Sequence, residues 1–310
     1  MDSDFDVVIV GGGIAGMTAA IYTARANLST IILEKEICGG LASWTHTIDN
    51  FPSYQSIHGM DLMQKIKDHV ESLNVRIEEI AEVNHLELDL LDKIIKTAES
   101  SYIGKSIILA TGRVPIPLPL ETDWEDHTHY CSICDGSLYK GKDLVVVGGG
   151  NSGFDESLYL LSLGVKSIVL VEAIDTCNAN EATQEKALAT KKITCRTNTR
   201  IGAICQQEGK GNITLENTKS GSMERILADG IFVFIGQRPN TKTLEGKVKL
   251  DNCGYIITDE FMHTNLPGVF AAGDVIVKRY RQLTTAMSDS TIAALEAIKY
   301  IRKKYDSSDL

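Results

Sequence analysis

A strand, a glycine turn, a helix and a second strand follow one another at the start of this chain, and this order constrains its fold more than any other feature. An apolar run over 6–10 ends in Gly11-Gly-Gly13, small and apolar residues continue at helical spacing over 14–25, and a β-branched run over 29–33 ends at Glu34. This order predicts a βαβ unit, in which two parallel strands are joined through a helix. Such a glycine turn lets the backbone approach a pyrophosphate at the helix N-terminus, so the unit is a candidate nucleotide site.

The same order returns 137 positions later, counted from Gly11 to Gly148. An apolar run over 143–147 leads into Gly148-Gly-Gly150, a helix continues to Leu163, and a run over 167–171 ends at Glu172. Two such units indicate two nucleotide-binding domains rather than one. We therefore predict an α/β fold class with two Rossmann-like nucleotide-binding domains of three layers (ββα), the second inserted into the first.

Two proline-containing segments mark the expected domain boundaries. Residues 113–119 hold three of the six prolines of the chain, and 236–241 form the second segment. Segments of this composition act as semi-rigid connectors between domains. We expect residues 1–114 and 244–310 to form one discontinuous domain and 115–243 to form the inserted domain.

The composition excludes several classes of protein. Lys and Arg number 31 against 41 Asp and Glu, a formal charge of −10, which argues against a nucleic-acid partner. Every apolar run is far shorter than the roughly 20 residues that span a bilayer, and no secretory signal is visible. Seven cysteines spread over 310 residues do not indicate a secreted disulfide framework. We expect a cytoplasmic protein with no membrane partner. We also expect its last helix to cover 284–301 and a solvated tail to follow from Lys303.

The acid at the end of each second strand indicates which nucleotide can bind. Glu34, which follows the motif completed by Gly16, is expected to accept hydrogen bonds from a ribose. Glu172 follows the motif completed by Gly153, and no Lys, Arg or His occurs over 172–184. A 2′-phosphate normally requires a cation, so NADPH is disfavoured and NADH fits better as a donor. The alternative is a degenerate second site that no longer binds a nicotinamide nucleotide.

Two cysteines lie close together in the inserted domain, in the segment Cys131-Ser-Ile-Cys134-Asp135-Gly136. Two intervening residues are typical of a reducible disulfide at the start of a helix, where the helix N-terminus lowers the pKa of a thiol. Asp135 could move protons as the thiolate leaves or returns. Zinc is the competing interpretation, but it needs four ligands, and only His127 and His129 are near in the sequence. We therefore expect no metal, and we interpret the other five cysteines as buried small hydrophobes.

Motifs along nearly the whole chain occur in the order seen in the low-molecular-weight thioredoxin reductases, a flavoprotein family that the sequence resembles. The specific motif is Cys-x-x-Cys-Asp-Gly between the two glycine motifs, because the glycine motifs alone fit many flavoproteins. The other matching motifs are Gly39-Gly40, Asp49-Asn-Phe-Pro52, Ala110-Thr-Gly112, Gly236-Gln-Arg-Pro-Asn240 and Gly268-Val-Phe-Ala-Ala-Gly-Asp274.

The resemblance implies FAD in the discontinuous domain and a thioredoxin-like protein as the partner. It implies that Cys134 is the thiol next to the flavin, that Cys131 attacks the partner's disulfide, and that Asp135 is the acid/base. It also implies a homodimer in which the inserted domain rotates about the two proline-containing segments. The implied FAD residues are Gly11, Gly13, Ile14, Ala15, Gly16, Glu34, Lys35, Gly40, Leu41, Asn50, Thr111, Gly112, Gly273, Asp274, Arg281, Gln282 and Leu283, and the nicotinamide nucleotide residues are Gly148, Gly150, Gly153 and Glu172.

The sequence also departs from the family pattern, and these departures leave the electron donor open. Glu172-Ala-Ile174 stands where NADPH-dependent members carry His-Arg-Arg, Leu41 replaces a glutamine, and residues 118–130 do not match. Ferredoxin or another non-nicotinamide donor, such as a deazaflavin, is therefore an alternative source of electrons. A dithiol oxidase is a further alternative, although such relatives tend to carry His in place of Asp135. A redox-sensing binding module without turnover is the alternative from a different class, whereas a ferredoxin–NADP reductase is disfavoured because it lacks the cysteine pair.

Overall fold

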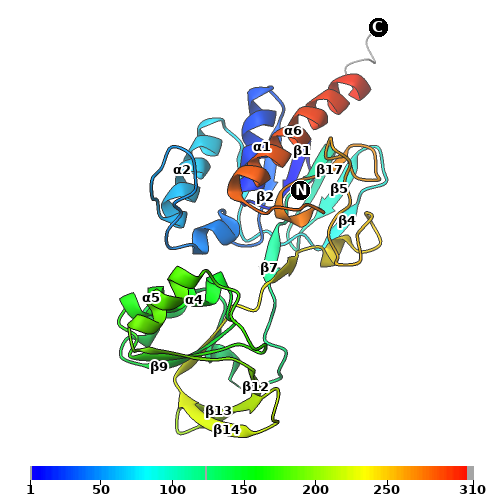
Figure 1. The fold of residues 1–310 in the computed structure, drawn as a ribbon. Coiled ribbons are helices and arrows are strands. Elements are labelled where there is room, and N and C mark those ends of the chain that lie inside the picture. The colour runs from blue at the N-terminus through cyan, green and yellow to red at the C-terminus, as the bar shows by residue number, and fades with distance from the viewer. Residues whose placement is uncertain (1, 123, 306–310) are drawn as a thin grey trace. The chain divides into compact units, whose positions relative to one another are not determined.

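The computed structural model describes residues 2–122 and 124–305, which form two compact units (Figure 1). Unit 1 comprises Met1–Val114 and Arg238–Leu310, and unit 2 comprises Pro115–Gln237. Unit 2 is therefore an insertion in unit 1. The second division, after Gln237, precedes the sequence-based boundary at 243/244, because residues from Arg238 onward already belong to unit 1.

Unit 1 is built on a seven-stranded sheet that is parallel at its centre. Its strands are β1 (Asp2–Val10), β2 (Thr30–Leu33), β3 (Arg76–Glu78), β4 (His85–Glu87), β5 (Lys93–Lys96), β6 (Ser101–Leu109) and β17 (Val269–Ala271), and its helices are α1 (Ile14–Arg25), α2 (Gly59–Ser72) and α6 (Leu283–Tyr305). The strand order is β3-β2-β1-β6-β5-β4, with β17 also paired to β6. Along β1, Val7 and Ile9 belong to the core shared with α1 and α6, whereas Val8 and Val10 belong to a second core. This period of two shows that both faces of the sheet are covered.

Unit 2 has three layers. Its elements are β8 (Thr128–His129), α3 (Ser132–Asp135), β9 (Asp143–Val147), α4 (Asn151–Ser162), β10 (Ser167–Val171), α5 (Glu181–Ala189), β11 (Ile193–Arg196), β12 (Thr199–Gln207), β13 (Lys210–Asn217), β14 (Met223–Ala228) and β15 (Gly230–Val233). The middle layer is a parallel sheet in the order β11-β10-β9-β15-β8. Phe154 and Leu160 of α4 pack on one of its faces, and the antiparallel sheet β12-β13-β14 packs on the other through Ile204 and Ile213. The predicted α/β class is confirmed.

Short elements complete the fold. Strands β7 (Arg113–Pro115) and β16 (Gln237–Pro239) pair with each other where the chain passes between the units. The 3₁₀ helices are η1 (Gly40–Trp44), η2 (Glu125–His127), η3 (Gly136–Tyr139), η4 (Lys242–Leu244) and η5 (Gly273–Val275). Two of them, η1 and η5, lie at the candidate site of unit 1.

Two sequence predictions at the ends of the chain were wrong. Strand β1 begins at Asp2 rather than at residue 6, because it continues its pairing with β6 as far as Ser101. Helix α6 continues to Tyr305, so residues 303–305 are not a solvated tail. The hydroxyl of Tyr305 donates to Asp92 Oδ1 at 2.7 Å, and three basic residues in the last turn favour the negative end of the helix dipole. Residues 306–310 of the expected tail lie outside the described residues.

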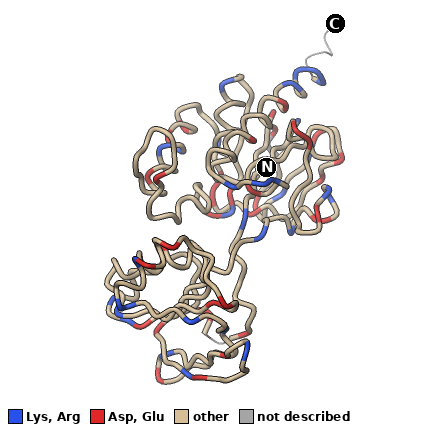
Figure 2. The backbone as a smooth tube through the Cα atoms, viewed as in Figure 1, with Lys and Arg blue, Asp and Glu red and all other residues tan. Residues whose placement is uncertain are grey.

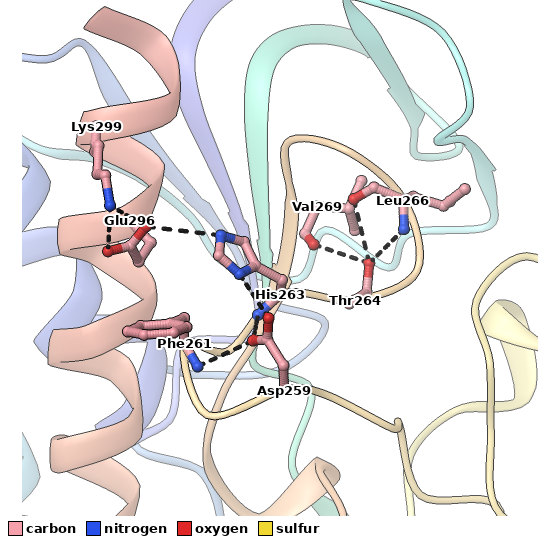
Figure 3. Close-up of polar contacts among 8 residues, drawn as sticks. All are labelled: Asp259, Phe261, His263, Thr264, Leu266, Val269, Glu296 and Lys299. Atoms are coloured by element: carbon pink, nitrogen blue, oxygen red, sulfur yellow. Dashed lines mark hydrogen bonds and ion pairs between the residues drawn. The ribbon is translucent and has the colours of Figure 1, made fainter. Parts of the chain in front are cut away.

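A polar cluster fixes the segment before β17 to α6 (Figure 3). The carboxylate of Asp259 accepts hydrogen bonds from the Phe261 and His263 amides and contacts His263 Nδ1, all at 2.9 Å. His263 Nε2 lies 3.7 Å from Glu296 of α6, which also pairs with Lys299. These contacts account for the polar side chains here, so the cluster is structural.

Lys and Arg are interspersed with Asp and Glu along both units (Figure 2). None of the described helices combines the length with the apolar composition that crossing a membrane requires.

Candidate functional site

The first glycine turn forms the amino end of α1. Gly11 has a φ of +108°, and its N–H donates to Leu33 O at 2.8 Å. A Cβ on Gly16 would overlap the carbonyl oxygen of Gly11, so strand and helix approach this closely only with glycine. A Cβ on Gly13 would meet nothing within 4 Å, and no side chain caps the helix there. Free N–H groups beside open space can bind a phosphate.

Glu34 holds this turn in place from the end of β2. Its Oε2 accepts from the Gly12 amide at 2.6 Å, and its Oε1 accepts from the Glu36 amide at 3.0 Å. A carboxylate has about four acceptor positions, so two remain for the hydroxyls of a ribose. Lys35, which the resemblance assigned to the same site, pairs with Glu36 at 3.2 Å and is exposed.

Three contacts bring distant members of the implied FAD set together. A Cβ on Gly40, at the start of η1, would lie 3.3 Å from Gly13 Cα. A Cβ on Gly273, at the start of η5, would lie 2.7 Å from the Ala15 side chain. Asn50 Nδ2 donates to Gln282 Oε1 at 3.4 Å. Segments about 40 and 270 residues along the chain therefore meet at the amino end of α1.

Asp274 is the residue of this group that best fits a polar ligand. Its Oδ1 is buried and has no hydrogen-bond partner among the described residues, although Lys278 Nζ lies 3.8 Å away. Burial raises the pKa of Asp274, and the charges of Lys278, Arg113 and Arg281 oppose that shift. A buried acceptor without a donor is costly, and hydroxyls of a ribityl chain would satisfy it.

Other members of the implied set have structural partners of their own. The guanidinium of Arg281 stacks on Tyr255, 4.1 Å from the ring centre, and donates to backbone carbonyls. Thr111 Oγ1 donates to Asn240 O at 2.8 Å. The remaining members are Ile14, the buried first residue of α1; Leu41, in η1; Gly112, with φ of +64°; and Leu283, the first residue of α6.

The second glycine turn repeats the geometry of the first. Gly148 has a φ of +117°, a Cβ on Gly153 would overlap the Gly148 carbonyl, and a Cβ on Gly150 would meet nothing within 4 Å. Glu172 Oε2 accepts from the Gly149 amide at 2.7 Å, as Glu34 does from Gly12. Unit 2 therefore presents a second helix N-terminus, that of α4, beside open space and a carboxylate.

Arg196, a cation outside 172–184, is adjacent to Glu172 through the backbone, because the Glu172 amide donates to Arg196 O at 2.9 Å. Arg196 ends β11 and is the register partner of Val171, the residue before Glu172. Its guanidinium donates to Glu224 Oε2 at 2.6 Å, and Glu224 is on β14. Arg196 lies outside 172–184 and could not be predicted here from the sequence, because the neighbouring strand, not the local sequence, brings it to this edge of the sheet.

The two close-spaced cysteines form a disulfide at the start of α3. Cys131 is the N-cap residue, and its Sγ accepts from the Cys134 amide at 3.1 Å. Cys131 is buried, with 6% of its surface exposed, whereas Cys134 is exposed. Because the amide points at sulfur, it can stabilise the Cys131 thiolate once the disulfide opens.

Asp135 is oriented by a hydrogen-bonded pair behind it. His129 Nδ1 lies 3.1 Å from Asp135 Oδ2, and His129 Nε2 lies 2.6 Å from the Tyr139 hydroxyl. Burial lowers the pKa of His129, only partly offset by Asp135, and burial raises the pKa of Tyr139 to about 12. Neutral His129 therefore donates a hydrogen bond from Nδ1 to Asp135 and accepts one at Nε2 from the Tyr139 hydroxyl. These two hydrogen bonds fix the tautomer of His129. From the sequence, His129 was predicted only as a possible zinc ligand.

A second carboxyl, that of Glu156 in α4, lies near α3, the helix that carries Cys134. Burial raises the pKa of Glu156 to about 7, Asp155 adds to the shift, and the Ser132 hydroxyl opposes it. Glu156 Oε2 and Ser132 Oγ are nevertheless both buried without a completed hydrogen bond among the described residues. Ser132 lies between the two cysteines, so a carboxyl that titrates near neutral pH is next to the disulfide. No group of three or more His, Cys, Asp or Glu in the described part of the chain could hold a metal ion.

Three comparisons relate this chain to known proteins. Residues 5–290 match a family model described as pyridine nucleotide-disulphide oxidoreductase. A 34.2 kDa protein in a rubredoxin operon of Clostridium pasteurianum is 41% identical over 306 residues, which cover 98% of this chain and 99% of that protein. The thioredoxin reductase of Bacillus subtilis (strain 168) is 35% identical over 309 residues, covering 96% and 95%. The crystal structure of Lactococcus lactis thioredoxin reductase matches with a TM-score of 0.89 and 36% identity, over 96% of this chain and 99% of that one.

Proposed function

Because the chain belongs to the pyridine nucleotide-disulphide oxidoreductase family, as a low-molecular-weight thioredoxin reductase, we propose that it uses FAD to reduce the disulfide of a thioredoxin-like protein. That it is a disulfide oxidoreductase follows from its relatives and from the Cys131–Cys134 disulfide. The observation that carries the finer proposal is this disulfide at a helix start, in a chain with two complete glycine turns. One turn suits the FAD and the other suits a donor nucleotide.

We propose that FAD binds in unit 1, where it would supply two-electron transfer when bound. The Gly13 side of the first turn would hold its pyrophosphate, Glu34 its adenosine ribose, and Asp274 its ribityl hydroxyls. The open space at Gly13 and the Asp274 oxygen that has no hydrogen-bond partner among the described residues support this assignment.

Two glycine variants test the FAD site. Gly13 has an ordinary φ of −72° and open space around its Cα, so Gly13→Ala should fold but obstruct the phosphate. Gly202→Ala, where the nearest atom to a new Cβ is 3.6 Å away, is the matched control in unit 2. We expect the control to retain one FAD per chain by absorbance and Gly13→Ala to lose it. Full FAD content in a folded Gly13→Ala protein would contradict the assignment.

In the proposed reaction the reduced Cys131 and Cys134 pair passes two electrons to the partner. Cys131 is buried in this structure, so a change of conformation would first expose it. The Cys131 thiolate would then attack one sulfur of the partner's disulfide and form a mixed disulfide, and the other partner sulfur would leave as a thiolate. The Cys134 thiolate then attacks Cys131 Sγ, which restores the disulfide and releases the second partner thiolate. Asp135 would move the protons, with its carboxylate held by His129.

Single cysteine variants test these two roles. Cys134→Ser should trap a thioredoxin as a mixed disulfide on Cys131, whereas Cys131→Ser should trap little, and both should lose turnover. The adduct can be counted by non-reducing electrophoresis and located by mass spectrometry. Equal trapping by the two variants would overturn the assignment of Cys131 as the attacking sulfur.

For the donor, we propose that NADH is preferred over NADPH if a nicotinamide nucleotide is used. The Glu172 carboxylate would repel a 2′-phosphate, and Arg196 of the neighbouring strand is paired with Glu224. One charge-assisted contact is worth about 1.5–3 kcal/mol, so the preference should be at least about tenfold. Steady-state kcat/KM values for NADH and NADPH test this preference. Glu172→Ala should bring the two values closer together.

Ferredoxin or another non-nicotinamide carrier is the second candidate donor. It is supported by the absence of a cation over 172–184 and by the relative from a rubredoxin operon. Anaerobic titration of the flavin absorbance with NADH, NADPH and reduced ferredoxin separates the two candidates. The family resemblance also implies a homodimer, which light scattering would test.

A further inference from the structure

Two cysteines that are 18 residues apart in the sequence lie against each other in unit 2. Cys177 is in the loop after β10, and Cys195 is in β11. Their sulfur atoms are 3.3 Å apart, and both side chains are half-buried. Disulfide sulfurs are about 2 Å apart, so a small side-chain movement brings this pair within bonding distance.

The pair adjoins the second glycine turn. A Cβ on Gly149 would lie 2.7 Å from Cys177 Sγ and 3.0 Å from the Cβ of Glu172, so these three residues are in close contact. The amides of Asn178 and Ala179 donate to Gly149 O at 3.0 and 3.2 Å. The loop that carries Cys177 is therefore fixed to the turn, and the thiols are held in place rather than brought together by a mobile segment.

We propose that Cys177 and Cys195 form a second, reversible disulfide in this enzyme, by exchange with a low-molecular-weight disulfide. One cysteine attacks the small disulfide and releases one small thiol, and the other cysteine then displaces the second small thiol. The small disulfide gains two electrons and two protons, and the protein loses two thiol hydrogens and gains one sulfur–sulfur bond. The bond would tie the loop at the turn to β11 and is separate from Cys131–Cys134.

The environment of the pair sets the order of the two steps. Burial raises the pKa of the Cys195 thiol to about 12, and its contact with Cys177 and the charge of Glu172 add to the shift. Cys195 therefore stays protonated near neutral pH, and Cys177 is the attacking sulfur. Once Cys177 is in a mixed disulfide, its thiol no longer contributes to the raised pKa of Cys195, and Cys195 can complete the exchange.

The other free cysteines provide controls, and two of them correct a sequence prediction. Cys38 is buried as expected, but Cys205 and Cys253 are exposed, so they are not buried hydrophobes. Among the described residues these two exposed thiols contact no other sulfur, so they would form adducts with a small disulfide rather than an internal bond.

The experiment uses the full chain with Cys131→Ser and Cys134→Ser, so that the established pair does not contribute. The reduced protein is exposed to glutathione disulfide while folded, quenched in acid, alkylated with N-ethylmaleimide and digested with trypsin. Cleavage after Lys166, Lys186, Lys192 and Arg196 puts the two cysteines in separate peptides, 167–186 and 193–196. We expect these peptides to be recovered joined, without alkylation, and about 2 Da lighter than their sum.

The controls make the result specific. Dithiothreitol before alkylation should return both peptides as singly alkylated species, and Cys177→Ser should leave Cys195 alkylated. Cys205→Ser, a matched change at an exposed cysteine, should leave the joined peptide unchanged. Alkylation of both Cys177 and Cys195 in the oxidised sample, or separate glutathione adducts on each, would overturn the proposal. Neither outcome depends on FAD or on the nucleotide donor, so a failure here is distinguishable from a failure of the proposed function.

Discussion

Removing the hydroxyl of Tyr139 should weaken catalysis by releasing the imidazole that orients Asp135. Tyr139→Phe deletes one hydrogen bond, the 2.6 Å contact to His129 Nε2. It keeps the ring, which packs edge-on against Phe232 with centres 5.7 Å apart. The change therefore tests the hydrogen bond and not the packing of the core.

The expected size of the effect follows from this one bond. A net hydrogen bond is worth about 0.5–1.5 kcal/mol, and about 1.4 kcal/mol corresponds to tenfold, so kcat should fall about 2- to 10-fold. The pH dependence has a definite sign. The Tyr139 proton donated to Nε2 stabilises neutral imidazole, so its loss raises the pKa of His129 from the value that burial has lowered. An imidazolium beside Asp135 makes that carboxylate a weaker base. The loss of kcat in Tyr139→Phe relative to the wild type should therefore grow as the pH falls toward 6.

The assay is kcat for a protein disulfide between pH 6 and 8, with Tyr102→Phe as the control. Tyr102 is a buried tyrosine in the core of unit 1. Tyr102→Phe therefore reports the effect on kcat of removing a buried hydroxyl in general. Proton NMR should show His129, assigned by comparison with His129→Gln, titrating at higher pH in Tyr139→Phe than in the wild type. An unchanged His129 titration together with an unchanged pH profile would refute the positioning role.

Three further predictions concern stability. Gly153→Ala places a Cβ on a backbone oxygen and should lower the free energy of unfolding by about 1–3 kcal/mol. Gly150 has open space around it, so Gly150→Ala should lose nucleotide affinity but little stability in thermal melts. Because the folded pKa of Glu156 is raised to about 7, the native state holds a proton that the unfolded state has lost, and stability falls as the pH rises from 5 to 8. Glu156→Gln should abolish that decline, a relative gain of about 2 kcal/mol at pH 8 by denaturant titration, and an unaltered pH dependence would contradict it. Tyr305→Phe removes the 2.7 Å bond to Asp92 and should speed amide exchange in the last turn of α6 at a cost of about 1 kcal/mol, with no effect on turnover.

The parts of the fold that local patterns specify were predicted well. The helix predicted over 14–25 and the strands predicted over 143–147 and 167–171 agree with α1, β9 and β10 to the residue. A continuous apolar run that ends in glycine identifies a buried strand without reference to the rest of the chain. The disulfide at the start of α3 could also be predicted from a local pattern, because its two cysteines are only three positions apart.

The sheet of β12, β13 and β14 was not assigned to residues from the sequence, although three layers were expected. Much of β12 is exposed, and its register shifts between Ile201 and Ala203. A bulge interrupts the alternation that identifies a half-buried strand, because it moves the following side chains to the opposite face. The pattern of buried residues in β12 therefore has no simple period, and its strand character depends on pairing with β13.

The charge around the second glycine turn shows why the site was harder to predict than the fold. Glu172 could be found from the sequence because it ends the strand that follows the motif. Arg196 reaches the same edge of the sheet only because β10 and β11 pair with Val171 opposite it, and Cys195 meets Cys177 through the same pairing. Whether Arg196 offsets the charge of Glu172 depends in turn on Glu224, which a third element supplies. In the proposed nucleotide site, the preference would depend on the register of two strands and on one ion pair. Glu224→Ala, which frees Arg196, should therefore shift the ratio of kcat/KM values toward NADPH without any change at Glu172.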